Sequence, residues 1–228
     1  MKIPPALQPT QVTILGYGAL LSESSSRLTF PHLTNFRYVQ IQGLRRQFAH
    51  PHLFLLSEGL VRYPETSQIG SLSVEPAPPQ IGFVAAAFEV SLNDEQRQAF
   101  VAREPEYKIG TAPFYALDHD DDNAVPLGEG VICLASHDKD HDIDLSSKPS
   151  SIDSVWHWPT DSGLLPLSMY LRHCLLAVQK AGGQPYESFL DDTYLSDRRT
   201  TLREYMKEYG EEVMASRPPA YFKNRYSG

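Results

Sequence analysis

The stretch that decides the fold is VTILGYGALL, residues 12–21. Its apolar first half predicts a buried strand with Val12–Leu20 as its bounds. Gly16 and Gly18 flank Tyr17 at the strand end, where glycine accepts backbone angles that other residues resist and leaves the main chain open to close approach. Successive N–H groups in such a turn can form an anion-binding concavity. An ordinary glycine turn after a strand accounts for the same residues, so both interpretations stay open here.

Composition and motifs argue against several classes of protein. A dinucleotide-binding loop needs a third glycine where its helix opens, and Leu21 occupies that position after Gly18. The formal net charge of −8 argues against a nucleic-acid-binding face, which is basic. No apolar run approaches the roughly 20 residues that span a bilayer, and the first residues, MKIPPALQPTQ, lack the apolar segment of a secretory signal.

The length and the cysteines indicate one cytoplasmic domain. With 228 residues, 41% of them hydrophobic, the chain is long enough for a single large domain with a proper core. Cys133 and Cys174 lie in apolar segments and have no C-x-x-C spacing. They are predicted to be reduced core residues of a cytoplasmic protein, without a disulfide framework and without a zinc or redox site.

Strands dominate the first part of the chain. Short apolar or alternating runs predict strands at Val12–Leu20, Phe36–Phe48, Leu53–Val61, Gly70–Val74, Ile81–Val90, Glu106–Asp118 and Gly130–Ala135. One helix interrupts them. Asn93 and Gln96 have the spacing of a capping box at its start. Pro105 ends it, because the residue before a proline is pushed away from helical angles.

Helices follow, and the segregation defines the fold class. An acidic loop over residues 137–162 precedes a helical region over residues 166–213. Strands followed by helices are typical of α+β proteins. About six or seven strands without alternating helices predict a compact mixed β-barrel with flanking helices and a C-terminal helical extension. We expect one domain over residues 1–228, with the barrel core over residues 11–136.

Glu104 is the strongest candidate for a catalytic group. It lies at the end of a predicted helix, where the negative end of the macrodipole disfavours the ionised carboxylate. Burial in a barrel mouth would raise its pKa further, as a general base at neutral pH requires. Arg103 would oppose this shift if it faces the same side. The alternative is a helix-end glutamate exposed to water, since glutamate is rarely fully buried.

The acidic loop contains aspartates and histidines, the residue types that bind metal ions. A calcium loop that begins at Asp138 needs glycine at its sixth position and glutamate at its twelfth, where Ile143 and Pro149 stand instead. His137 and His141 have the spacing of two ligands on one helix face, but their flanking residues predict a loop. A solvated acidic loop is therefore preferred, and neither a metal nor a cofactor is predicted.

Several segments together resemble one family. Gly16–Leu20 resembles the YGSL loop of the γ-glutamylcyclotransferase-like superfamily, and Val39–Arg46, VQIQGLRR, is similar to its V-x-V-x-G-[YF]-R-R strand. Phe100–Tyr107, FVAREPEY, resembles the L-D-x-R-E-x-x-Y segment that carries the catalytic glutamate. Ile81–Ser91 is similar to the family's G-x-V-F-E-V-S strand, and Pro166–Phe189 is similar to the helix that follows later in the family's order. The matches cover residues 12–115 and 166–205 in the family's order.

The resemblance implies a barrel fold and an intramolecular cyclisation that forms 5-oxoproline from a small γ-glutamyl substrate. It assigns the role of catalytic base to Glu104, without a metal. Four residues of the loop would hold the γ-glutamyl moiety, and two tyrosines would line the pocket: Tyr17, Gly18, Ala19, Leu20, Tyr107 and Tyr170. Two residues depart from the family pattern, because Ala19 replaces a serine and Val101 stands where aspartate is common.

Two other functions stay open at this point. The first is a binding protein that keeps the pocket but has lost turnover, for which Ala19 is the first indication. The second is a metal-dependent function of the loop at His137 and His141. Nucleic-acid and membrane partners are not expected, and the leaving amine and the oligomeric state are not predicted.

Overall fold

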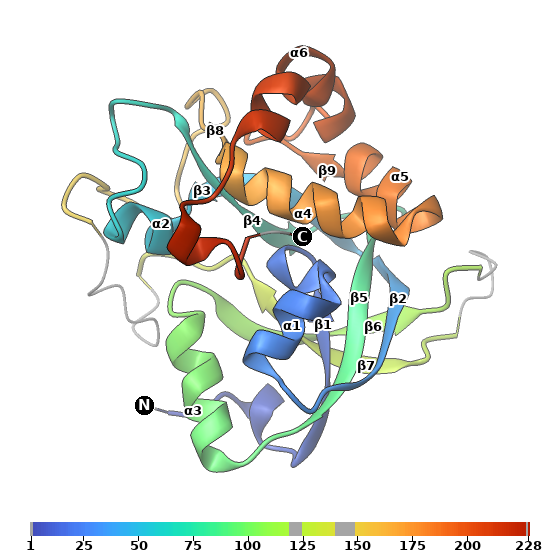
Figure 1. Cartoon of the computed structure of the whole chain (residues 1–228). Helices are drawn as coiled ribbons and strands as arrows, with labels where there is room; N and C mark the ends of the chain where they lie inside the picture. Colours follow the sequence, from blue (N-terminus) through green and yellow to red (C-terminus); the bar gives the residue numbers. More distant parts are fainter. Residues whose placement is uncertain (1, 119–124, 140–148, 227) are drawn as a thin grey trace.

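The computed structural model describes residues 2–118, 125–139, 149–226 and 228, and it has an α+β fold with two sheets (Figure 1). The first sheet is a closed barrel in the order β1-β5-β2-β6-β7. Its strands are β1 (Gln11–Gly16), β2 (Thr34–Gln42), β5 (Gly82–Ser91), β6 (Lys108–Tyr115) and β7 (Gly128–Leu134). Neighbours pair antiparallel, except that β1 and β7 close the ring in parallel at Ile14 and Val131.

The second sheet has the order β8-β4-β3-β9. Its strands are β3 (Leu44–Pro51), β4 (Gln68–Pro76), β8 (Leu165–Pro166) and β9 (Thr193–Tyr194). The prediction of six or seven strands in one barrel was therefore wrong in its count. Gly43, with φ of 72°, separates β2 from β3. Glycine adopts such an angle without strain, so the predicted strand Phe36–Phe48 breaks there and its second half joins the other sheet.

Helices lie at both ends of the molecule and also between them (Figure 1). They are α1 (Glu23–Thr29), α2 (Leu53–Ser57), α3 (Asp94–Arg103), α4 (Ser168–Ala181), α5 (Gly183–Asp191) and α6 (Leu202–Ala215). Single 3₁₀ turns are η1 (Pro5–Leu7), η2 (Ala19–Leu21) and η4 (Ala220–Phe222). In Figure 1, α4, α5 and α6 lie on the side of the second sheet, and α3 lies at the opposite end beside the N-terminus. Within the described ranges, no helix has the length and apolar character that a membrane span needs.

One predicted strand is a helix instead. Leu53–Val61 forms α2 and a following turn, and Leu53, Leu55 and Leu56 point into the protein interior. Short apolar runs do not distinguish a buried strand from a buried helical turn, which explains the error. The correction matters for the site, because α2 forms part of the cavity described below.

The predicted start and end of α3 are confirmed. The Asn93 side chain accepts a hydrogen bond from the Gln96 N–H at 2.8 Å, and the Gln96 side chain accepts one from the Asn93 N–H at 3.0 Å. The helix ends at Arg103, so Glu104 is its C-cap residue with φ of −116° and ψ of 52°. Pro105 follows directly, which turns the chain away from the helix axis at the catalytic candidate.

The acidic loop is packed in the part that is described. Ile152 and Val155 are fully buried, and Asp138 accepts hydrogen bonds from the Val155 and Trp156 N–H groups. The Trp156 indole N–H donates to the Glu106 carbonyl oxygen at 2.8 Å. This part of the loop therefore supports the segment that carries the candidate acid and is not merely solvated.

Candidate functional site

A cavity of about 610 Å³ lies where the end of β1, the end of α3, α2 and α4 meet. Its volume falls in the range of roughly 300–1,000 Å³ that is usual for small-molecule sites. All seven residues predicted from the sequence line it: Tyr17, Gly18, Ala19, Leu20, Glu104, Tyr107 and Tyr170. The fold thus brings together residues that are up to 153 positions apart, since 170 − 17 = 153.

The two glycines of the loop are explained by close packing. A Cβ at Gly16 would lie 2.5 Å from the Leu20 Cβ, and one at Gly18 would overlap the Tyr170 hydroxyl. Neither glycine has a positive φ, so the expected special backbone angles are not the reason for them. Tyr170 on α4 can therefore touch the loop main chain only because residue 18 lacks a side chain.

The loop also leaves main-chain donors without partners. Ala19–Leu21 is a single 3₁₀ turn, and the first N–H groups of such a turn have no acceptor within it. The N–H groups of Gly18, Ala19 and Leu20 have no hydrogen-bond acceptor among the described residues. These donors belong to residues of the cavity wall, so they are available to an acceptor on a ligand.

Glu104 is largely buried and is paired on one side. Its side chain is 18% exposed, and its Oε1 accepts a hydrogen bond from the Arg103 Nε at 3.0 Å. Burial raises the pKa of Glu104 above its ordinary value, and the charges of Arg103 and Arg225 oppose the shift without cancelling it. Burial, one of the two causes expected from the sequence, is the largest cause of this shift. The opposition by Arg103 that the sequence suggested is present.

Glu106 is a second acid in the cavity that sequence reasoning missed. Burial, and next the charge of Glu104, raise the pKa of Glu106 to about 8. Its carboxyl is therefore mostly protonated at neutral pH and can donate a hydrogen bond, whereas a carboxylate only accepts. The signal in the sequence was the Glu-Pro-Glu run at residues 104–106, which places two acids beside one proline.

Three tyrosines form an aromatic wall with polar tips. The Tyr17 hydroxyl donates to the Cys133 carbonyl oxygen at 2.6 Å, and the Tyr107 hydroxyl donates to the Leu72 carbonyl oxygen at 2.8 Å. Burial raises the pKa of Tyr17, Tyr107 and Tyr170 well above the ordinary value, so all three stay neutral. Because the hydroxyl hydrogens of Tyr17 and Tyr107 are committed to carbonyls, these oxygens act toward a ligand as acceptors.

The last segment of the chain also lines the cavity. In Figure 1 the last segment runs from α6 past α2 and ends near α1 and α4. Arg225 and Tyr226 line the cavity, and Tyr226 is only 2% exposed. The Gly228 N–H donates to the His173 Nδ1 at 2.9 Å, and the His173 Nε2 lies 3.4 Å from the Ala19 carbonyl oxygen.

His173 therefore joins the last segment to the loop. Burial lowers the pKa of His173 to about 4, so the ring is neutral at pH 7. Since Nδ1 accepts the Gly228 N–H, the hydrogen of the neutral ring lies on Nε2 and points to the Ala19 carbonyl. Two distant parts of the cavity wall are thus fixed by one buried ring on α4.

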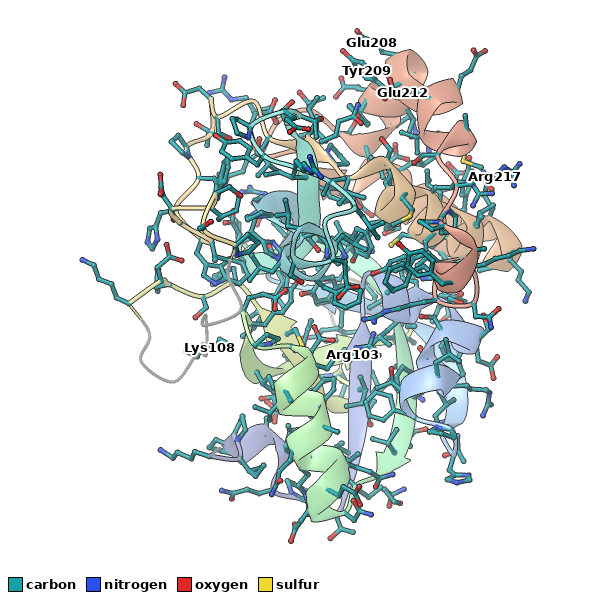
Figure 2. All side chains as sticks on the ribbon, turned by 60° about the vertical axis from the view of Figure 1, so that its left-hand side comes forward. Arg103, Lys108, Glu208, Tyr209, Glu212 and Arg217 are labelled. Atoms are coloured by element: carbon teal, nitrogen blue, oxygen red, sulfur yellow. The ribbon has the colours of Figure 1, made fainter. Side chains whose placement is uncertain are left out.

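Charged side chains separate into those at the cavity and those far from it. Figure 2 shows Arg103 at the inner end of α3, near the centre of the molecule. Glu208, Tyr209, Glu212 and Arg217 lie on or beyond α6 at the far end of the same view. Arg103 is thus a cavity residue, whereas Arg217 is remote and offers a control position for experiments.

The described residues do not form a metal site at the acidic loop or elsewhere. No group of three or more histidine, cysteine, aspartate or glutamate side chains in these ranges is arranged to hold a metal ion. His137 stacks on His157, with 3.4 Å between the Nδ1 of the former and the Nε2 of the latter. His141, the other residue of the suggested pair, lies outside the described residues.

Comparisons with known proteins were made against families, curated proteins and solved structures. No family model and no curated protein matches the chain. It is similar to a solved gamma-glutamyl cyclotransferase, with 12% identity, a TM-score of 0.48 and coverage of 92% of this chain and 90% of that chain. An uncharacterized protein from Homo sapiens is 12% identical, with a TM-score of 0.47 and coverage of 93% of this chain and 92% of that chain. A yeast gamma-glutamyl cyclotransferase specific to glutathione is 11% identical, with a TM-score of 0.40 and coverage of 96% of this chain and 95% of that chain. These similarities concern the fold alone.

Proposed function

We propose that this chain is a γ-glutamylcyclotransferase-like enzyme, which converts the γ-glutamyl group of a small amide or peptide into 5-oxoproline and releases the amine. Glu104 is the general base and then the general acid. One observation carries the proposal. Glu104 and the loop residues Tyr17–Leu20 line the same cavity, where a molecule of the right size can touch both.

The reaction needs one proton carrier and no nucleophile from the protein. Glu104 takes a proton from the α-ammonium group of the substrate. The freed amine attacks the γ-carbonyl carbon of the same molecule, a new C–N bond closes the five-membered ring, and the original amide bond breaks. Glu104 gives this proton to the leaving nitrogen as the amide bond breaks, then takes the second proton from the ring nitrogen and passes it to the released amine. The products are the neutral lactam and an ammonium ion, so atoms and charge balance without water. Intramolecular attack gains from the proximity of the reacting atoms, which the cavity would fix.

Two features of the cavity suit these steps. The raised pKa of Glu104 brings its proton affinity closer to the working pH, where a general base is most efficient. The partnerless N–H groups of Gly18, Ala19 and Leu20 can stabilise the negative charge that develops on the carbonyl oxygen. Ala19 lacks the hydroxyl of the usual serine but keeps the N–H on which this role depends.

A binding protein on the same fold is the second candidate, and one contact favours it. The 3.0 Å ion pair between Arg103 and Glu104 stabilises the ionised carboxylate and weakens it as a base. The replacement of the family's serine by Ala19 also favours a binding protein. Thermal stabilisation by γ-glutamyl compounds without release of 5-oxoproline would select this candidate.

The test of the enzyme proposal is the variant Glu104→Gln. We expect 5-oxoproline release to fall by about 10²- to 10⁴-fold, the usual contribution of a general acid–base group. Glutamine can still accept the hydrogen bond from Arg103, so the melting temperature should stay close to that of the wild type. Glu95→Gln is the matched control, because Glu95 lies on the same helix and is exposed outside the cavity. Full activity of Glu104→Gln in a folded protein would refute the assignment of the base.

A further inference from the structure

The last segment of the chain brings a cation without an anionic partner into the cavity. The Arg225 guanidinium lies over the Phe54 ring of α2, with 4.3 Å from Cζ to the ring centroid. Among the described residues, no carboxylate lies within 4.0 Å of this guanidinium, and its side chain donates no hydrogen bond. A guanidinium has five N–H donors, so a free one at a cavity wall is available to an anion.

Arg225 is held in this position on both sides. Before it, Phe222 packs edge-on against Phe54 with 5.7 Å between the ring centroids. After it, Tyr226 is buried and packs edge-on against His173 with 5.6 Å between the centroids. The Arg225 N–H donates to the Phe222 carbonyl oxygen at 3.0 Å. The guanidinium therefore belongs to a built wall of the cavity.

The other charges of the cavity do not neutralise Arg225. Arg103 and Glu104 form a pair of their own. Glu106, with a pKa of about 8, is mostly uncharged at neutral pH. The charge of Arg225 also reaches the reacting region, since it contributes to lowering the pKa values of Glu104, His52 and His173. The described side chains of the cavity thus leave the positive charge of Arg225 uncompensated.

We infer that Arg225 binds a carboxylate on the leaving amine, so that the preferred substrates are γ-glutamyl amino acids or peptides and not γ-glutamyl amines without a carboxylate. This inference rests on the proposed function. Glu104 must touch the substrate ammonium, and the glutamyl carboxylate is bonded to the same carbon. More than 4.0 Å separates the Arg225 guanidinium from the Glu104 carboxylate, so Glu104 does not use this cation and it is available to the leaving-group carboxylate. An arginine fork matches a carboxylate in a bidentate geometry.

A matched pair of substrates isolates this contact. L-γ-Glutamyl-L-alanine and L-γ-glutamyl-ethylamide differ only in the carboxylate of the leaving amine. We expect the wild type to prefer the alanine compound by about 10- to 100-fold in kcat/KM, as hydrogen bonds to a charged group suggest. Arg225→Gln should abolish most of this preference, chiefly through a higher KM for the alanine compound. Arg225→Lys should restore part of it.

Arg217→Gln serves as the control, since it removes one arginine of the same segment far from the cavity (Figure 2). Equal use of the two substrates by the wild type would overturn the inference. So would an equal loss on both substrates in Arg225→Gln, which would mean that Arg225 acts through Glu104 or the glutamyl carboxylate. A melting temperature close to that of the wild type excludes simple loosening of the segment.

Binding measurements separate this inference from the proposed function. If neither substrate yields 5-oxoproline, calorimetric titration of both compounds decides. Tighter binding of the alanine compound, lost in Arg225→Gln, would support the arginine while the enzymatic proposal fails. Equal affinity for the two compounds, or no binding of either, would overturn the inference as well.

Discussion

Arg46 and Arg225 place positive charge inside the same protein in opposite circumstances. Arg46 on β3 is fully buried and donates to the Thr193 hydroxyl at 2.7 Å, the Val84 carbonyl at 2.9 Å and the Ser188 carbonyl at 3.0 Å. Its guanidinium also lies between the rings of two core phenylalanines, Phe83 and Phe189. The Arg225 guanidinium lies over two rings, Phe54 at 4.3 Å and Tyr226 at 5.8 Å, and has no anionic partner among the described residues.

The difference separates structure from function. The donors of Arg46 are matched by the fold itself, and they join the second sheet to the barrel strand β5 and the helix α5. Burial lowers the pKa of Arg46 to about 10, so it stays charged at pH 7. The polar groups of the cavity are left with spare capacity, which only a ligand or solvent can fill. Arg46 is therefore part of the scaffold, whereas the spare donors of the cavity are available to a ligand.

The strongest test of the saturated side is Arg46→Met. Removal of the guanidinium leaves two buried carbonyls and a hydroxyl without their donor, and we expect a loss on the order of 4 kcal/mol in the free energy of unfolding. Denaturant unfolding measures it. Arg27→Met is the control, because Arg27 forms an exposed ion pair with Glu23 and should cost less than about 1 kcal/mol. Similar losses of unfolding free energy in the two variants would show that the buried hydrogen bonds of Arg46 stabilise the fold no more than an exposed ion pair does.

Glu106→Gln tests the unsaturated side through pH. The folded pKa of Glu106 is about 8, against an ordinary 4.5, so the folded state binds a proton in this range that the unfolded chain has released. The free energy of unfolding of the wild type should therefore fall as pH rises from about 5 to about 8. The Glu106→Gln variant lacks this titration. Its free energy of unfolding should therefore rise relative to that of the wild type by something on the order of 2 kcal/mol over that pH range.

The pH series for Glu106 has a control on the neighbouring helix. Glu95→Gln removes an exposed carboxyl from α3, so its pH dependence should follow that of the wild type. A Glu106→Gln curve parallel to the wild type from pH 5 to pH 8.5 would show that the carboxyl ionises normally in the folded protein.

The smallest expected effect concerns His50, a buried polar residue of the scaffold that is not saturated. His50 stacks on Trp156 with 4.4 Å between centroids, and both of its ring nitrogens lack a partner among the described residues. His50→Phe should stabilise the protein by about 1 kcal/mol at pH 7, because an unpaired buried donor is costly. Thermal or denaturant unfolding at pH 7 and pH 5 provides the check.

The stability of His50→Phe relative to the wild type should increase as the pH falls. Burial lowers the pKa of His50 from 6.5 to about 3, so only the unfolded chain takes up a proton as pH falls below 6.5. The wild type loses stability there, and the variant does not lose this contribution. A destabilised His50→Phe would indicate that the ring nitrogens have partners, for example ordered water.

Sequence reasoning reached the parts of the molecule that depend on local pattern. The capping box at Asn93 and the proline after Glu104 fixed α3 and its end, because both act through neighbouring residues. The break at Gly43 was missed, since a single glycine inside a strand pattern does not by itself mark a turn, and only tertiary pairing sends β3 to another sheet. α2 was missed because five residues are too few for a helical period to emerge.

The candidate site was predicted as far as its motifs extend. Glu104 and the loop at Tyr17–Leu20 were found from short patterns, and the fold brings them to one cavity. Arg225 stands 121 positions after Glu104, since 225 − 104 = 121, and it enters through a segment without a motif. Glu106 was passed over because its unusual proton affinity arises from burial, which a sequence does not display.

The most direct test of the central claim is product analysis with L-γ-glutamyl-L-alanine. Wild type and Glu104→Gln are incubated with this compound, and 5-oxoproline, alanine and glutamate are quantified by mass spectrometry. Intramolecular cyclisation under the control of Glu104 predicts equal amounts of 5-oxoproline and alanine from the wild type, no glutamate, and release at least about 10²-fold slower from the variant. Glutamate in place of 5-oxoproline, or undiminished release by Glu104→Gln, would contradict it.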